Sequence, residues 1–267
     1  MLNAKHCLVT GSSQGIGLAV AKAMLAANAC VLLTSERPVD DFPAVHQLLD
    51  LHPGRAYYRQ ANLIDASSTT TLLEAAWHAF GGLDVLVNNA GTFREPSFLE
   101  LDKSHFDFVF GLNVWSALAL TQGFVRRNIE ARRSGRILFT TSLNATRSEP
   151  EHTLYDSSKS ALNGLIRQLA IELAPMGFTT VGLAPGLVET PLTDFGLKSS
   201  PAERQLVLDQ IPLRCIATVD DLAGWYVFLA SDAARYATGT IINVDGGLDA
   251  QQMASRPISP AERAPNP

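Results

Sequence analysis

Three side chains between Thr140 and Lys159 have the types and spacing to transfer a proton. Tyr155 follows Ser142 by thirteen positions, and Lys159 comes four positions after the tyrosine. In a helix, residues four apart lie on one face, so the ammonium group would sit beside the phenol. A free tyrosine titrates near ~10, and a nearby positive charge favours its phenolate. The plain alternative is a half-buried ring beside a solvated lysine.

Asparagine residues form a second group of candidates. Asn113 lies among apolar residues in a helical pattern over 102–129, where a buried amide needs hydrogen-bond partners. It is therefore either a structural bridge between helices or part of an active site. Asn88 and Asn89 end a buried strand pattern just before Gly91. They could form a plain turn or line a cofactor cleft, because ligands of open parallel sheets bind at the carboxyl ends of strands.

A glycine-rich turn near the amino terminus could bind a dinucleotide. Gly11, Gly15 and Gly17 follow a short strand pattern over 6–10 and precede a pattern with helical spacing. Glycines let the backbone approach a pyrophosphate closely, and the amino end of a helix favours its negative charge. Glycine clusters also make ordinary turns, but this position between a first strand and a first helix indicates a nucleotide site.

The end of the second strand pattern, over 30–34, bears on the choice of cofactor. In dinucleotide-binding folds an acidic residue here binds the 2′-hydroxyl of the adenine ribose. Glu36 would favour NAD, whereas Ser35 and Arg37 could accommodate the 2′-phosphate of NADP. Either charged residue could also simply point into solvent. The sequence leaves NAD and NADP open, with a slight preference for NAD.

Length and composition limit the kinds of protein that this chain can be. Its 267 residues are 46% hydrophobic and 18% charged, which suits a soluble globular core. The net charge of −5 argues against nucleic acid or an anionic membrane as the main partner. Neither a membrane-spanning run nor a signal peptide is indicated. The cysteines and histidines lack metal-ligand spacing, so we expect no metal site. The three cysteines are an odd set, which favours reduced thiols in a cytoplasmic protein.

The order of strand and helix patterns predicts the fold. Seven strand patterns alternate with helical segments, which is typical of an α/β protein with helices on both faces of a parallel sheet. We expect residues 1–250 to form one domain with a Rossmann-type, doubly wound sheet of seven parallel strands. Residues of about 187–215 are predicted to form a mobile cap that contacts the substrate. The polar, proline-rich residues 251–267 are predicted to be a flexible tail.

Together these motifs resemble those of the short-chain dehydrogenase/reductase family, in its single-domain short form, over residues 4–250. They are the spacing TGxxxGxG in the glycine-rich turn, the run NNAG ending at Gly91, and the run PGLVET beginning at Pro185. The resemblance implies a catalytic tetrad of Asn113, Ser142, Tyr155 and Lys159. It implies cofactor contacts from Gly11, Ser13, Gly15, Ile16, Gly17, Ser35, Glu36, Asn62, Leu63, Asn89, Ala90, Gly91, Tyr155, Lys159, Pro185, Gly186, Val188 and Thr190.

Two positions depart from the family pattern. The family often has an aspartate in contact with the adenine where this chain has Asn62, whose amide still offers an acceptor and a donor. NAD-dependent members usually place aspartate where Ser35 stands, which keeps the choice between NAD and NADP open.

The resemblance also implies a mechanism. Tyr155 would be the general acid/base, with Lys159 lowering its pKa and holding the nicotinamide ribose. Ser142 would orient the substrate oxygen, and Asn113 would fix a water that completes a proton path. The chain would then be an NAD(P)-dependent oxidoreductase that interconverts a secondary alcohol and a carbonyl by hydride transfer.

Several substrates and assemblies fit this mechanism. A sugar or polyol dehydrogenase is the leading interpretation. A 3-oxoacyl thioester reductase is the alternative, because Phe195 and Leu197 in the cap could contact an acyl chain. A non-catalytic nicotinamide-cofactor sensor is a third hypothesis, which the intact tetrad disfavours. The helix of Tyr155 is apolar on more than one side, and relatives associate through it, so we expect a homotetramer or homodimer.

Overall fold

The computed structural model describes residues 1–193 and 201–252 and confirms the predicted α/β fold. Its strands form one sheet of seven parallel strands in the order β3-β2-β1-β4-β5-β6-β7. The strands are β1 (His6–Val9), β2 (Cys30–Ser35), β3 (Ala56–Gln60), β4 (Val85–Asn88), β5 (Gly135–Thr140), β6 (Phe178–Pro185) and β7 (Thr240–Val244).

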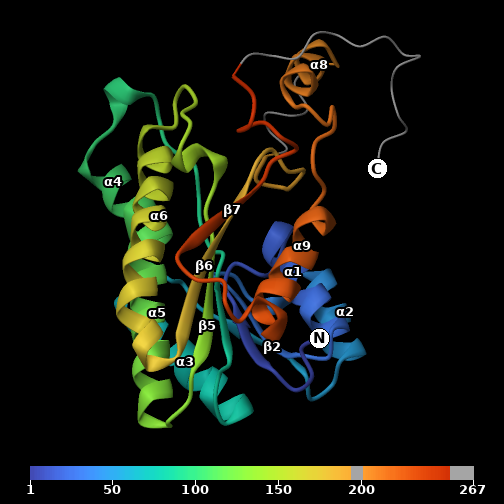
Figure 1. Ribbon diagram of the computed structural model, residues 1–267, viewed down its shortest axis with the longest axis vertical. Helices are drawn as coiled ribbons and strands as arrows, with labels where there is room; N and C mark the ends of the chain where they lie inside the picture. Colours follow the sequence, from blue (N-terminus) through green and yellow to red (C-terminus); the bar gives the residue numbers. More distant parts are fainter. Residues whose placement is uncertain (194–200, 253–267) are drawn as a thin grey trace.

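Helices cover both faces of the sheet (Figure 1). The α1, α2 and α9 helices lie on one face, and α3, α5 and α6 lie on the other, with α4 at the end of that second layer. Their bounds are α1 (Gly15–Ala26), α2 (Pro43–Leu51), α3 (Ala66–Phe80), α4 (Lys103–Phe110), α5 (Ser116–Glu130), α6 (Thr153–Leu173), α8 (Pro201–Gln210) and α9 (Asp220–Ala230).

The central strands are apolar throughout because helices bury them from both sides. In β4, Val85 and Val87 pack into the hydrophobic core under α1 and α9, whereas Leu86 packs into the core on the opposite face. Alternate residues of a strand point to opposite faces, so one short strand contributes to two cores. This double burial explains why the strand patterns read as continuous apolar runs.

The long helical pattern predicted over 102–129 is interrupted in the structure. The α4 and α5 helices are joined by a π-helical turn, Gly111–Trp115, which contains Asn113. Such turns are single-turn insertions that widen a helix and are frequent at functional sites. Among the described residues, the combined stretch Lys103–Glu130 has the length and composition to cross a membrane. Buried core helices meet the same two criteria, and α5 packs against the sheet in this structure.

The predicted cap over 187–215 is described only in part. Val188 forms a bridge with Ala217, and α8 stands at the top of the molecule, beyond the helices that cover the sheet (Figure 1). Phe195 and Leu197 lie outside the described residues, as does most of the predicted tail. Hydrogen bonds fix the chain where the predicted tail begins. Arg147 donates to the Asp249 carboxylate and to the carbonyl of Gln251.

Candidate active site

The predicted site residues gather at the carboxyl ends of five strands. The glycine-rich turn follows β1, Glu36 follows β2, Asn89 follows β4, Ser142 follows β5 and Gly186 follows β6. Because all the strands are parallel, these ends share one edge of the sheet, where open α/β sheets bind ligands. The topology therefore brings together residues from the first and second halves of the chain.

The glycine-rich turn is closed by contacts that no larger residue would allow. Gly11 has a φ of +59°, and a side chain there would lie 2.9 Å from Cα of Ala90. A Cβ on Gly17 would lie 2.3 Å from the carbonyl oxygen of Gly11 and 2.5 Å from Nδ2 of Asn89. A Cβ on Gly15 would meet Thr190 at 3.7 Å, so the segment after β6 borders the same turn. The glycines keep this backbone bare and close-packed.

The amino end of α1 is suited to an anion. Its N-cap residue, Gln14, makes no side-chain capping bond, and its first turn holds no acidic residue. The first N–H groups of a helix lack intrahelical partners, and the helix dipole adds positive potential there. Ser13 is buried and Ile16 is half-buried beside this turn. The bare glycine backbone and the uncapped helix end fit a pyrophosphate such as that of NAD or NADP.

A buried hydrogen-bond network fixes the turn to the rest of the sheet. Asn89 donates from Nδ2 to the carbonyls of Thr10 and Gly11, at 2.9 and 3.1 Å. Its Oδ1 accepts a bond of 3.0 Å from Oγ1 of Thr140. The same Oγ1 lies 2.6 Å from the hydroxyl of Tyr226, which is fully buried in α9. Since the threonine proton is directed to Asn89, Tyr226 is the donor in that second bond.

Lys159 is attached to the same residue of β5. Its Nζ donates to the carbonyl of Thr140 at 2.9 Å, and the side chain is almost fully buried, with 4% of its surface exposed. Burial lowers the pKa of Lys159 from its ordinary 10.5 to about 8. Nζ also lies 5.6 Å from the centre of the Tyr155 ring. The helical spacing thus places the ammonium group beside the phenol, as the sequence predicts.

The pKa of Tyr155 moves in the direction opposite to our expectation. Burial raises it above the ordinary 10.0, hydrogen bonding with Ser142 lowers it, and the charges of Asp156 and Glu149 raise it further. Desolvation disfavours the phenolate more than the neighbouring groups favour it. Tyr155 is therefore a neutral phenol at pH 7 in this structure, with Ser142 as its hydrogen-bonding neighbour.

The side-chain amide of Asn113 is hydrogen-bonded to other parts of the protein. It is 1% exposed, and its amide bonds both the N–H and the carbonyl of Thr92 at 2.8 Å. Nδ2 also donates to Oγ of Ser158 at 2.9 Å, and that hydroxyl donates to the carbonyl of Tyr155. These contacts match the structural alternative for Asn113, a bridge between helices. They also tie the loop after β4 to the helix of Tyr155.

The end of β2 carries a carboxylate that a neighbouring side chain holds. Ser35 is buried at the end of β2 and donates to Oε2 of Glu36 at 2.9 Å, which holds the exposed Glu36 in place. Arg37 is paired with Asp41 at 2.8 Å. Asn62 is exposed and accepts a local bond from the N–H of Ile64. Its neighbour Leu63 is buried.

Close packing and hydrogen bonds fix the segment that follows β6. Pro185 ends β6, and a Cβ on Gly186 would lie 2.8 Å from Cα of Asp245. Val188 is buried, and the carbonyl of this residue accepts a bond of 2.5 Å from Oγ1 of Thr193. Oγ1 of Thr193 also accepts from the N–H of Thr190 at 3.0 Å. These bonds place the segment beside the glycine-rich turn.

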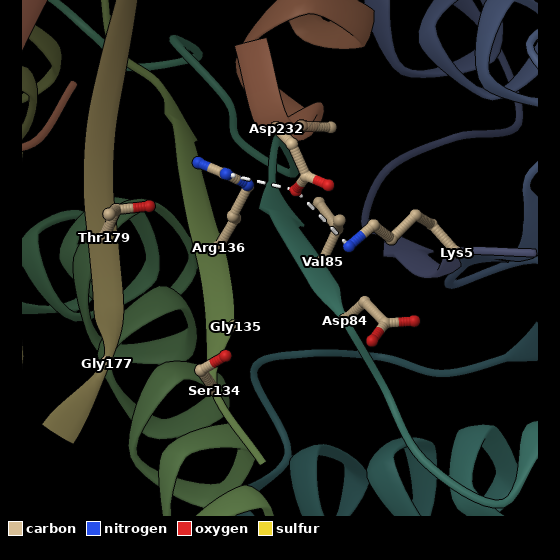
Figure 2. Close-up of a pocket in the computed structure, with 10 residues that line it drawn as sticks. Lys5, Asp84, Val85, Ser134, Gly135, Arg136, Gly177, Thr179 and Asp232 are labelled. Carbon is tan, nitrogen blue, oxygen red and sulfur yellow. Dashed lines mark hydrogen bonds and ion pairs between the residues drawn. The ribbon is translucent and has the colours of Figure 1, made fainter. Parts of the chain in front are cut away.

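A separate cavity of about 120 Å³ lies where the strands begin, at the opposite edge of the sheet (Figure 2). Lys5 and Arg136 both contact the carboxylate of Asp232 there, at 3.6 and 3.4 Å. The carboxylate of Asp84, on the same wall, is bonded to Arg133 at 2.8 Å. Its charges are paired within the protein, and none of the predicted site residues lines it.

Some site residues carry no pattern in the sequence. Tyr226 lies in an ordinary apolar helix pattern, and its bond to Thr140 spans 86 positions. His152 and Phe93 also border the site, with ring centres 5.7 and 6.2 Å from that of Tyr155. The sequence offered one signal for these residues, which is that His152 precedes Tyr155 by three positions.

Known proteins are similar to this chain over nearly its whole length. The family model described as Enoyl-(Acyl carrier protein) reductase matches residues 11–249. L-rhamnose 1-dehydrogenase (NAD(P)(+)) of Azotobacter vinelandii is 35% identical, covering 91% of this chain and 96% of that protein. A 3-oxoacyl-(acyl-carrier-protein) reductase of Synechocystis sp. is 34% identical, covering 92% of this chain and 98% of that protein.

A solved structure gives the same result. A crystal structure from Agrobacterium tumefaciens with bound NADP, provisionally assigned as a 2-deoxy-D-gluconate 3-dehydrogenase, superposes with a TM-score of 0.84. It is 31% identical, and the match covers 94% of this chain and 98% of that one.

The burial of Lys159 leads to a prediction about the free energy of unfolding. Its lowered pKa means that folding at pH 7 bears the desolvation of an ammonium group. Lys159→Met should therefore raise the free energy of unfolding at pH 7 by roughly 2 kcal/mol, because the shift is equivalent to roughly 3 kcal/mol and the lost bond to Thr140 costs about 1 kcal/mol. Urea unfolding monitored by circular dichroism measures this difference.

The pH dependence has a definite sign. Between about 8 and 10.5 the unfolded chain keeps the lysine proton that the folded chain has released, so wild-type stability rises with pH. The advantage of the variant should therefore shrink across that window. Lys22→Met, at an exposed position on α1, is the matched control and should change little. A Lys159→Met protein less stable than wild type at pH 7 would contradict the argument.

Proposed function

Because the chain belongs to the short-chain dehydrogenase/reductase family, we propose that Tyr155 is its general acid/base in the interconversion of a secondary alcohol and a carbonyl. The wider activity follows from the family: the protein is an NAD(P)-dependent oxidoreductase acting on CH–OH groups. The observation that carries the proposal is the convergence of Ser142, Tyr155 and Lys159 beside the glycine-rich turn.

Each residue of the site has a separate role in the proposed reaction. When bound, the nicotinamide accepts or gives the hydride. The neutral phenol of Tyr155 donates its proton to the substrate oxygen in reduction, and its phenolate accepts that proton in oxidation. Ser142 hydrogen-bonds the same oxygen and stabilises the charge that develops there. Lys159 supplies a positive charge beside the phenol and holds the ribose.

In this proposal Asn113 does not contact the substrate but positions the residues around the site. Its amide fixes Thr92 and Ser158, and so it sets the distance between the cofactor loop and the helix of Tyr155. The predicted water and proton path would then use the π-helical turn around Asn113, where the helix is widened.

The geometry at the end of β2 favours NAD in our proposal. Glu36, held by Ser35, offers an acceptor for the ribose 2′-hydroxyl and would repel a 2′-phosphate. Arg37, the residue that could neutralise a phosphate, is already paired with Asp41. The similar Agrobacterium tumefaciens structure holds NADP, so both cofactors belong in the test.

Two substrate classes remain in the proposal. The Azotobacter vinelandii relative acts on a sugar, which supports a sugar or polyol substrate for this chain. The Synechocystis relative is named for a 3-oxoacyl thioester, the alternative class. The catalytic proposal is compatible with both. A small-molecule substrate, rather than nucleic acid or a membrane, also fits the net charge of −5. The odd set of three cysteines supports a cytoplasmic location in this proposal.

We further propose that residues 1–250 act as one domain and assemble as a homotetramer or homodimer. The predicted contact face on α6 is only partly available, because Leu162 is buried in the core and Leu165 packs against it. Exposed apolar side chains remain, with Ile171 of α6 73% exposed and Trp115 of the π-helical turn 61% exposed. Trp225 and Phe228 of α9, which covers the opposite face of the sheet, are also exposed (Figure 1). Exposed apolar side chains on both helical layers suit a tetramer.

Turnover with nicotinamide cofactors tests the central proposal. Absorbance of the reduced nicotinamide is followed with NAD⁺ and NADP⁺ separately over aldoses, polyols, simple secondary alcohols and 3-hydroxyacyl thioesters. Tyr155→Phe should reduce kcat by about 10²–10⁴-fold, because it removes the transferable proton, while NADH still binds. Turnover that survives unchanged in this variant would rule out the assigned role. NADH binding without turnover of any substrate would instead favour a cofactor sensor.

Cofactor choice is tested at Glu36. Glu36→Ala should lower kcat/KM for NAD⁺ by about tenfold and improve the ratio for NADP⁺, since a charge-assisted hydrogen bond and a repulsion are both removed. Arg37→Ala is the matched control, because its guanidinium is engaged by Asp41, and it should leave the ratio near the wild-type value. A ratio that moves with Arg37 and not with Glu36 would indicate an NADP enzyme.

Assembly is tested by light scattering coupled to gel filtration. The wild type should have about four times the mass of the 28.7 kDa chain. Ile171→Glu combined with Trp115→Glu should halve that mass or reduce it to the monomer, because charge at a buried apolar contact opposes association. A monomeric wild type would reject the proposal.

A further inference from the structure

His152 is fixed beside the proposed acid/base. It stands immediately before α6, and its ring centre is 5.7 Å from that of Tyr155. Phe93 packs edge-on against both rings, at 5.6 Å from His152 and 6.2 Å from Tyr155. Three rings in mutual edge-to-face contact hold one another in place. The imidazole therefore has a set position next to the reacting phenol.

Only one nitrogen of the imidazole is used by the protein. Nδ1 lies 3.2 Å from Oε2 of Glu149 and 3.5 Å from Nδ2 of Asn144. Glu149 accepts, so Nδ1 carries a proton, and the carboxylate raises the pKa of His152. Within residues 1–193 and 201–252, Nε2 has no hydrogen-bond partner. The side chain is 24% exposed, so a small molecule can reach it.

The charges around this imidazole disfavour an anionic partner. The carboxylates of Glu149, Asp156 and Glu95 all act on His152. Asp156 accepts bonds from Asn144 and from the N–H of Glu149, and Glu95 accepts from the N–H of Leu154. Three carboxylates outnumber one imidazole, so a carboxylate or phosphate group would be repelled. A hydroxyl has no such penalty and can pair with Nε2 in either protonation state.

We propose that His152 is a specificity-determining residue whose Nε2 hydrogen-bonds a second, uncharged hydroxyl of the substrate. The reacting oxygen lies at Tyr155 and Ser142, and the second hydroxyl is one or two carbon atoms away, toward the imidazole. Vicinal diols and polyols have this arrangement, whereas a simple secondary alcohol does not. The inference rests on the proposed function and narrows its substrate class to polyhydroxylated compounds.

A matched pair of substrates isolates the second hydroxyl. The measured quantity is kcat/KM for 2,3-butanediol divided by kcat/KM for 2-butanol, which differ by that group alone. His152→Leu should lower this ratio by about tenfold, through KM for the diol, and leave the rate with 2-butanol within about twofold. His152→Gln should restore most of the ratio, because its amide keeps a donor and an acceptor. His46→Leu is the control and should not change the ratio, because His46 of α2 pairs with Asp40 as His152 pairs with Glu149 but lies on another helix.

The outcomes separate this inference from the proposed function. Equal losses with both substrates in His152→Leu would mean that the ring only supports Tyr155, and would overturn the inference alone. A wild-type preference for 3-hydroxybutyrate over the diol, lost in His152→Leu, would overturn the argument from charge. Absence of Tyr155-dependent turnover with every substrate would overturn the proposed function and this inference with it.

Discussion

The arrangement of the site depends on one residue at the carboxyl end of β5. The hydroxyl of Thr140 bonds Asn89, which in turn holds the carbonyls of the glycine-rich turn, and its main-chain carbonyl bonds the ammonium group of Lys159. One residue thus links the proposed cofactor cradle to the proposed proton-transfer group. The bond to Lys159 is buried and the two bonds of Asn89 are partly buried, and leaving a buried partner unsatisfied costs about 1–3 kcal/mol. The two halves of the site therefore cannot shift independently.

Local physical requirements made much of this predictable from the sequence. The glycine-rich turn needs a bare backbone, and a Cβ on Gly17 would meet the Gly11 carbonyl, so only this residue type fits. Tyr155 and Lys159 are four positions apart, so helix geometry alone places their side chains on the same face. Continuous apolar runs identified the buried parallel strands. Tyr226 and the π-helical turn could not be found in this way, because their partners lie far along the chain or depend on packing.

Electrostatics was the least predictable part. The sequence places a positive charge beside the phenol, which argues for a lowered tyrosine pKa, but it does not give the depth of burial. In the structure, burial raises the pKa of Tyr155 and lowers that of Lys159 to about 8. Both shifts favour the uncharged forms, and they have one cause. A site without water strengthens the interactions of the protein with a charge that develops during the reaction. The same lack of water disfavours a permanent charge on a side chain.

The bond between Tyr226 and Thr140 also has a consequence for biosynthesis. The glycine-rich turn, Asn89 and Thr140 are all translated before residue 141, yet the hydroxyl that completes their network lies in α9. A nascent chain released at that midpoint would also leave the outer side of α1 without α9, against which it packs. Such a chain would also lack the segment after β6 that borders Gly15, so the surroundings of the turn are complete only in the nearly full-length chain.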